Sequence, residues 1–258
     1  MFDPAGRPMI ESLTGISQTA LIVIMGIVFV AGFVRGLTGV GLAVVLVPLV
    51  NLVMPPERTV LLAVLVGCLA GLLGYRAAWG NVDRRLVVTI TVATIAATPV
   101  GLYLLFHTPE DVTRIAIAFI ALLAFVAVVI PRPDIPPAGT LPIVLTGLLT
   151  GLLGAFAAIP GPPVIHYFVR RGVPATIARD SLIVIFLWAP LAVAIIALAV
   201  GKLDLQLAVL ALACFPALVI GNTLGARNFG KMPEQQWRLL VVGLIAIATV
   251  GAIVRAMS

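Results

Sequence analysis

Long apolar runs alternate with short breaks along the 258-residue chain, and the breaks hold charged residues, prolines and glycines. Most runs contain about 18 residues or more, which is enough for a helix to cross a hydrocarbon core of roughly 30 Å. The pattern therefore predicts an all-α, polytopic membrane protein. The ten expected segments lie at about residues 19–34, 37–54, 58–78, 85–106, 112–130, 140–158, 161–169, 174–200, 204–226 and 236–256.

Composition strengthens this prediction and leaves no room for a soluble domain. The chain is 62% hydrophobic and 10% charged, with a mean hydropathy of +1.22. Its net charge of +6 comes from basic residues in short loops, where they set orientation in the membrane, so we expect no binding to nucleic acid. Residues 1–18 have neither a basic n-region leading into an apolar run nor a small-residue cleavage pattern, and we expect an uncleaved tail there.

Five segments lie on each side of a proline-rich stretch at residues 131–139, PRPDIPPAG. We interpret this stretch as an extended linker between a first repeat, residues 19–130, and a second, residues 140–258. A shift of 115 positions places Gly32, Gly36, Gly39 and Pro48 on Gly147, Gly151, Gly154 and Pro163. A shift of 124 places Gly101, Pro109, Glu110 and Arg114 on Gly225, Pro233, Glu234 and Arg238. Internal repeats are typical of secondary transporters, although the unequal shifts leave coincidence as the alternative.

The distribution of basic residues favours inverted repeats. If the first two segments of each half return the chain to its starting side, as two crossings or as a re-entrant hairpin near the midplane, 11 basic residues lie on one side of the membrane and 5 on the other. If the first pair instead makes one net crossing, the division is 9 against 7. The inverted topology fits the positive-inside rule better and places both ends of the chain outside.

Two breaks within apolar runs predict a binding cavity inside the membrane. PPVIHYFVR is too short to span and follows a proline cluster, and RGLTGVG, residues 35–41, is the corresponding break in the first half. Non-helical backbone at this depth must be buried in protein or line a cavity. A half-helix that starts there directs free N–H groups and its positive dipole end into the cavity, which suits an anion. Close helix packing is the alternative for the glycines.

The substrate-binding candidates follow from these two breaks. The hydroxyls of Thr38 and Thr150 could donate to an anion or bond their own helix. Arg35 could be a ligand or a charge that only sets the topology. His166 could donate to the substrate or be a structural residue. The candidate set is Arg35, Gly36, Thr38, Gly39, Gly41, Thr150, Gly154, Pro160, Gly161, Pro162, Pro163 and His166.

Further polar residues lie outside the two breaks. Arg179 and Asp180 start a long apolar run, where we expect a helix-cap and gating pair, with a solvated helix end as the alternative. Asn51 and Asn222 are single amides in apolar surroundings that could line the cavity.

Motifs for catalysis, nucleotide binding or metal binding do not occur in the sequence. It contains neither G-x-x-x-x-G-K-[ST] nor H-E-x-x-H, and no loop has a channel-filter signature. Cys68 and Cys214 lie within apolar runs without a second ligand nearby, and we expect them to be buried core residues. We therefore predict no enzyme activity, no cofactor and no metal site.

The glycine and proline pattern resembles that of the sulfite exporter TauE/SafE family, also called the toluene sulfonate uptake permease family. The resemblance rests on GFVRGLTGVGLAVVLVPLV and GLLTGLLGAFAAIPGPPVIHYFVRRGVPATIARDSLIV, and it extends over the chain from about Gly32 onward. Family members commonly have a denser glycine run at the second break, where this chain has GAFAAIPGPP.

This resemblance implies a secondary transporter of the cell inner membrane that moves sulfite or a small organosulfonate such as sulfoacetate. We expect export by alternating access within the lipid bilayer, and we leave homo-oligomer formation open. Alternatives are a transporter of a different small anion and a non-transporting assembly or anchoring subunit. Transport of a metal cation is disfavoured because the apolar runs lack carboxylates.

Overall fold

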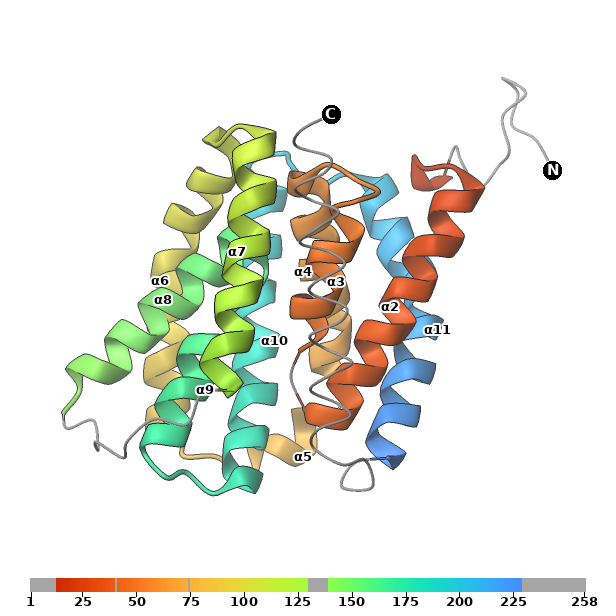
Figure 1. The fold of residues 1–258 in the computed structure, drawn as a ribbon. Coiled ribbons are helices and arrows are strands. Elements are labelled where there is room, and N and C mark those ends of the chain that lie inside the picture. Colours follow the sequence, from red (N-terminus) through yellow and green to blue (C-terminus); the bar gives the residue numbers. More distant parts are fainter. Residues whose placement is uncertain (1–12, 40, 74, 130–138, 229–258) are drawn as a thin grey trace.

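The computed structural model describes residues 13–39, 41–73, 75–129 and 139–228, and these ranges contain helices and no strand. This confirms the predicted all-α fold class. The helices, labelled in Figure 1, are α2 (Gln18–Thr38), α3 (Leu42–Val50), α4 (Pro56–Leu72), α5 (Tyr75–Trp79), α6 (Arg84–His107), α7 (Glu110–Val129), α8 (Leu141–Ala157), α9 (Gly161–Arg170), α10 (Ala175–Ala199) and α11 (Leu205–Arg227).

Four of the described helices are long and apolar enough to cross a membrane. They are Gln18–Leu37, Arg84–His107, Thr176–Ala199 and Leu205–Arg227. Many large apolar side chains on these helices are exposed, as expected for surfaces that face lipid rather than water. The chain is therefore a multi-pass membrane protein, as the apolar runs predicted.

Helices from opposite halves of the chain form the two closest pairs. α2 packs along α11, and α6 packs along α8. A Cβ atom added to Gly36 of α2 would lie 2.1 Å from the carbonyl oxygen of Asn222 in α11, and one added to Gly151 of α8 would lie 2.1 Å from that of Thr94 in α6. Glycine is required at both crossings because the two backbones touch. The close-packing interpretation is confirmed for these glycines.

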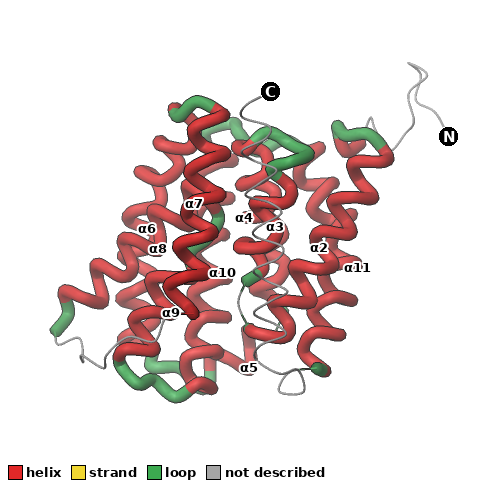
Figure 2. Tube along the Cα trace, in the orientation of Figure 1, coloured by secondary structure: helices red, strands yellow, loops and turns green. Residues whose placement is uncertain are grey.

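The helices that follow the two breaks, α3 and α9, are short. α3 has 9 residues and α9 has 10, so at about 1.5 Å per residue neither can cross a membrane alone. Figure 2 shows the loops that interrupt the helices, and Figure 1 shows α2 running downward while α8 runs upward.

Left-handed backbone conformations produce both breaks. Between α2 and α3, Gly39 has φ 79° and Gly41 has φ 100°, while Ala158 at the end of α8 has φ 56°. The first break therefore begins at Gly39, later than predicted, because α2 continues through Thr38. The segment expected at 37–54 is corrected accordingly: its first residues belong to α2, and its helix is the shorter α3.

The second correction concerns the segment expected at 58–78. The structure divides it into α4 and α5, because Leu73 ends α4 in an extended conformation. The segment expected at 236–256, residues 1–12 of the tail and residues 131–138 of the linker lie outside the described residues.

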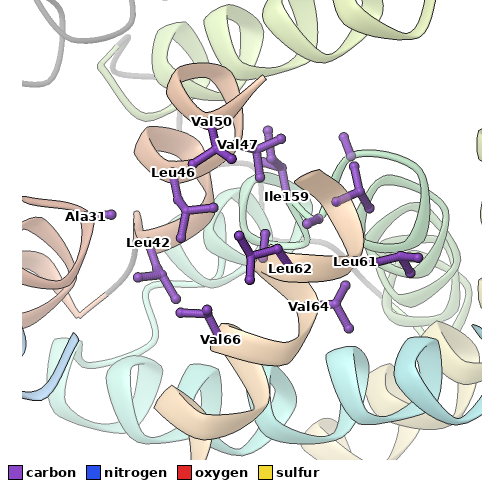
Figure 3. Close-up of a cluster of buried hydrophobic side chains, with 14 of the residues drawn as sticks. Ala31, Leu42, Leu46, Val47, Val50, Leu61, Leu62, Val64, Val66 and Ile159 are labelled. Atoms are coloured by element: carbon purple, nitrogen blue, oxygen red, sulfur yellow. The ribbon is translucent and has the colours of Figure 1, made fainter. Parts of the chain in front are cut away.

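A continuous apolar core surrounds the short helix α3. Side chains of α3 and α4 meet Ile159 from the second break in this core (Figure 3). Cys214 is fully buried there, which confirms the expectation for this residue, whereas Cys68 is only half-buried. The core brings residues beside the two breaks, far apart in sequence, into one cluster.

Candidate functional site

A cavity of about 150 Å³ lies where the two helix breaks meet. This volume is far above the roughly 10–15 Å³ needed for one water molecule, so a small oxyanion or sulfonate has room in it. Its wall combines residues from both halves of the chain: Val34, Arg35, Gly41 to Val45, Ala63, Val64, Gly67, Ala70, Thr94, Thr98, Ala124, Thr150, Gly151, Gly154, Ala158 to Pro162, Ile165, Phe186, Ala189, Pro190 and Val193.

The first turn of α3 forms one part of the wall. Leu42, Ala43 and Val44 line the cavity, and the first backbone bond into this helix is donated by Val45 to the carbonyl oxygen of Gly41, 3.3 Å away. Gly41 occupies the N-cap position of α3 and has no side chain that could accept from the first amides. Amide groups in the first turn of a helix have no acceptor within that helix, so the positive end of α3 faces the cavity.

The first turn of α9 contributes a different surface. Pro160, Gly161 and Pro162 line the cavity, but Pro162 and the adjacent Pro163 have no amide hydrogen. Gly161 is therefore the only donor among the first three residues of α9. The two half-helices present their positive ends to one space, and α3 supplies more of the backbone donors.

Arg35 is the one charged side chain among the described residues of the wall. Its guanidinium donates to Oδ1 of Asn222 at 2.9 Å and to the carbonyl oxygen of Ala70, also at 2.9 Å. These bonds tie α2 to α11 and to the end of α4. An intramembrane cation beside a cavity favours an anionic ligand.

Three threonine hydroxyls line the same cavity, from α6 and α8. Thr94 donates to the carbonyl oxygen of Gly147 at 3.1 Å, and Thr98 donates to that of Thr94 at 2.9 Å. Thr150 is fully buried, and its hydroxyl has no hydrogen-bond partner among the residues that the structure describes. A buried hydroxyl without a partner raises the free energy of the folded protein, so Thr150 is the polar group of the wall that gains most from a hydrogen bond to a ligand.

Seven of the twelve substrate-binding candidates line this cavity together: Arg35, Gly41, Thr150, Gly154, Pro160, Gly161 and Pro162. Gly36 instead packs against α11, and Gly39 lies beside the side chain of Arg179. His166 is half-buried, and neither it nor Pro163 is part of the wall. Thr38 ends α2, and its side chain lies outside the described part of the structure.

The predicted cap at Arg179 and Asp180 is wrong, because α10 begins at Ala175 with Pro174 in the cap position. Both charged residues lie in the second turn of the helix. Asp180 accepts a hydrogen bond from Nδ2 of Asn81 at 2.8 Å. The gating role assigned to the two residues stays a prediction.

The two single amides also have different positions from those expected. Asn222 contacts Arg35 from outside the cavity wall. Asn51 is buried at the end of α3 and is not part of the wall either. Within the described ranges, neither of its two amide atoms has a hydrogen-bond partner.

Sequence reasoning did not identify Thr94, Thr98 and Ala158 as cavity residues. The two threonines belong to a long helix without a break, and an alanine gives no sign that its backbone is left-handed. Ala158 stands at the break where a denser glycine run was expected, and it adopts a conformation that glycine adopts at lower cost. Within the described ranges, no three metal-ligating side chains of His, Cys, Asp or Glu gather at one place.

Comparison with known proteins provides one match. The family model for the sulfite exporter TauE/SafE matches residues 24–252, which include both breaks and every residue of the cavity wall. No curated protein and no solved structure matches the chain.

Proposed function

Because the chain belongs to the sulfite exporter TauE/SafE family, we propose that it exports sulfite or a small organosulfonate across the inner membrane. Membership of this family implies a membrane transporter of sulfur anions rather than an enzyme. The choice of anion, the outward direction and the inner membrane are the proposal.

The observation that carries the proposal is the convergence of anion-binding features on one intramembrane cavity. The start of α3 directs its amides at this space, Arg35 supplies a positive charge, and the Thr150 hydroxyl has no partner in the described part of the chain. Sulfite and sulfonate oxygens are acceptors that match all three kinds of donor. The described wall contains no carboxylate, which disfavours a metal cation as cargo.

The arrangement of the helices supports alternating access between two inverted repeats. α2, the first helix of one half, pairs with α11, and α8, the first described helix of the other half, pairs with α6. α2 and α8 also run in opposite directions (Figure 1). In inverted-repeat transporters the substrate lies near the midplane between the halves, which is where the two breaks meet in this proposal.

Export of a doubly charged anion needs no separate coupling ion in this proposal. Each negative charge that leaves a negative-inside cell gains about 2.3 kcal/mol per 100 mV of membrane potential. Two charges double that gain, so the potential alone drives accumulation outside.

Flux measurements in proteoliposomes test the proposal. Purified protein is reconstituted, the vesicles are loaded with sulfite, sulfoacetate, taurine or chloride, and efflux is followed with and without an imposed potential. We expect saturable, potential-dependent efflux of sulfite or sulfoacetate. Absence of flux and of saturable binding for every sulfur anion would contradict the proposal and favour the non-transporting alternative.

A pair of arginine variants locates the site in the same assay. Arg35→Gln removes the charge beside the cavity, and we expect the KM for the sulfur anion to rise. Arg58→Gln is the control, because Arg58 forms its ion pair with Asp204, at 3.1 Å, away from the cavity wall. Equal effects of the two variants would place the anion somewhere else.

A further inference from the structure

The uncharged amide of Asn222 holds the cavity cation in place. Asn222 lies in α11 and accepts a hydrogen bond from a terminal nitrogen of Arg35 at 2.9 Å. The other terminal nitrogen of Arg35 donates to the carbonyl oxygen of Ala70, in the last turn of α4. The two bonds fix the plane of the guanidinium, because its donors form a rigid fork.

Both acceptors are neutral, and this affects the charge beside the cavity. Arg35 forms no ion pair with a carboxylate among the described residues, whereas the arginines at 58 and 114 each form one. A partly buried cation held by an acidic partner would present little net charge to a ligand. Held by an amide and a carbonyl, Arg35 keeps its full positive charge next to the space.

The position of Asn222 is itself fixed by the tightest helix contact in this region. A Cβ atom on Gly36, next to Arg35, would lie 2.1 Å from the carbonyl oxygen of Asn222. Gly225, one turn later in α11, touches the backbone of α2 in the same way, since its added Cβ would lie 2.1 Å from the carbonyl oxygen of Phe33. The backbone of Asn222 therefore cannot move away from Arg35 without separating the two helices.

From these contacts we infer that Asn222 is a positioning residue for anion binding, holding the Arg35 guanidinium toward the cavity through a neutral acceptor that leaves its charge available. The inference rests on the proposed function, because it takes the cavity as the anion site. Asn222 acts through Arg35 and does not touch the anion.

Asn222→Asp tests the neutrality of the acceptor. The substitution preserves shape and the acceptor oxygen but adds a negative charge beside Arg35. We expect the Kd for doubly charged sulfite to rise by roughly tenfold or more, because the ion pair cancels the charge that faces the cavity. The Kd for singly charged methanesulfonate rises by a smaller factor, and the melting temperature stays the same or rises.

Asn228→Asp is the matched control, since it adds the same charge to the exposed end of α11, where Asn228 bonds the carbonyl oxygen of Leu224. We expect wild-type affinity for both anions. Asn222→Leu tests positioning separately: it removes the acceptor without adding charge, and we expect a similar loss of affinity for the two anions.

The wild-type and variant affinities together distinguish failure of the proposed function from failure of the inference alone. If the wild-type protein binds no sulfur anion, the proposed function fails, and the inference fails with it. If the wild type binds sulfite and Asn222→Asp or Asn222→Leu binds it equally well, the inference alone is wrong. Equal losses for sulfite and methanesulfonate in Asn222→Asp also overturn it, because loosened packing does not distinguish one charge from two. If the wild type binds sulfite only, the comparison of Asn222→Asp with Asn228→Asp decides.

Discussion

Replacing Thr150 with valine is expected to make the empty protein more stable and the anion complex weaker. The two side chains have nearly the same shape, so the substitution removes the hydroxyl and preserves the packing of α8. The hydroxyl is fully buried, lines the cavity and has no partner in the described structure. Stability and affinity should therefore change in opposite directions.

The magnitudes follow from the cost of an unsatisfied hydroxyl and the gain from a charged hydrogen bond. A buried polar group without a partner costs about 1–3 kcal/mol, so Thr150→Val should raise the free energy of unfolding of the empty protein by about 1 kcal/mol or more. A hydrogen bond to a charged ligand contributes about 1.5–3 kcal/mol. Its loss should weaken anion binding by roughly tenfold to a hundredfold.

The assay is a thermal or denaturant unfolding curve in detergent, recorded with and without sulfite. Thr150→Val should unfold later than wild type without ligand, and sulfite should stabilise it less, because the stabilisation by a ligand falls as Kd rises. Thr146→Val is the matched control. It lies one turn earlier in the same helix and donates to the carbonyl oxygen of Pro142 at 2.8 Å, outside the cavity wall.

We expect the control to lose stability slightly and to bind sulfite like wild type. A Thr150→Val protein that is less stable than wild type when empty would show that the hydroxyl has a partner in the protein. Unchanged sulfite affinity would refute the assignment of Thr150 to the anion site.

Three further changes test the fold around the site. Gly36→Ala places a Cβ 2.1 Å from a carbonyl oxygen of α11 and should destabilise the protein by about 1–3 kcal/mol. The control Gly26→Ala, in the same helix, meets nothing within 4 Å and should stabilise the protein by up to about 1 kcal/mol. Similar melting temperatures for the two variants would contradict the packing of α2 against α11. Ala158→Gly should raise stability by about 0.5–1 kcal/mol, since a left-handed residue other than glycine costs about 1–2 kcal/mol. Ala157→Gly, one residue earlier and helical, should lower stability by a similar amount. Denaturant titrations measure both changes. Asp204→Asn should lower the free energy of unfolding by less than about 1 kcal/mol, because it retains the cap bond to the Leu207 amide and loses only an exposed ion pair. Asp204→Ala should lower it by about 1 kcal/mol more, because it also loses the cap. Equal melting temperatures for these two variants would show that the cap contributes nothing.

Much of the fold followed from the apolar pattern because a bilayer imposes strict conditions on a spanning helix. The bounds expected for the helices at 85–106, 140–158, 174–200 and 204–226 agree with the structure to within about two residues. The short helix after the proline cluster was also predicted, since prolines leave few other conformations. The position of the first break was predicted less accurately, because glycine residues occur both within a helix and at its end.

The candidate site was predictable in part. Residues at the two breaks were selected from local signals, and seven of them line one cavity. Thr94, Thr98 and Phe186 join the same wall without any local signal, because their positions depend on how α6 and α10 pack against α8 and α9. Gly36 was assigned to the site from the same local signal, and the structure shows it at a helix crossing instead.

The sequence alone determined that the chain lies in a lipid bilayer, that its fold is all-α and which family it resembles. These conclusions rest on hydrophobic runs, helix breaks and the glycine and proline pattern, which are properties of short segments. Tertiary structure decided which glycines separate helices, which residues face the cavity, and that the cation at Arg35 is held by neutral groups from α4 and α11. Asn222 lies 187 positions from Arg35 in the chain. No local pattern records such a contact, because it exists only where two helices from different halves meet.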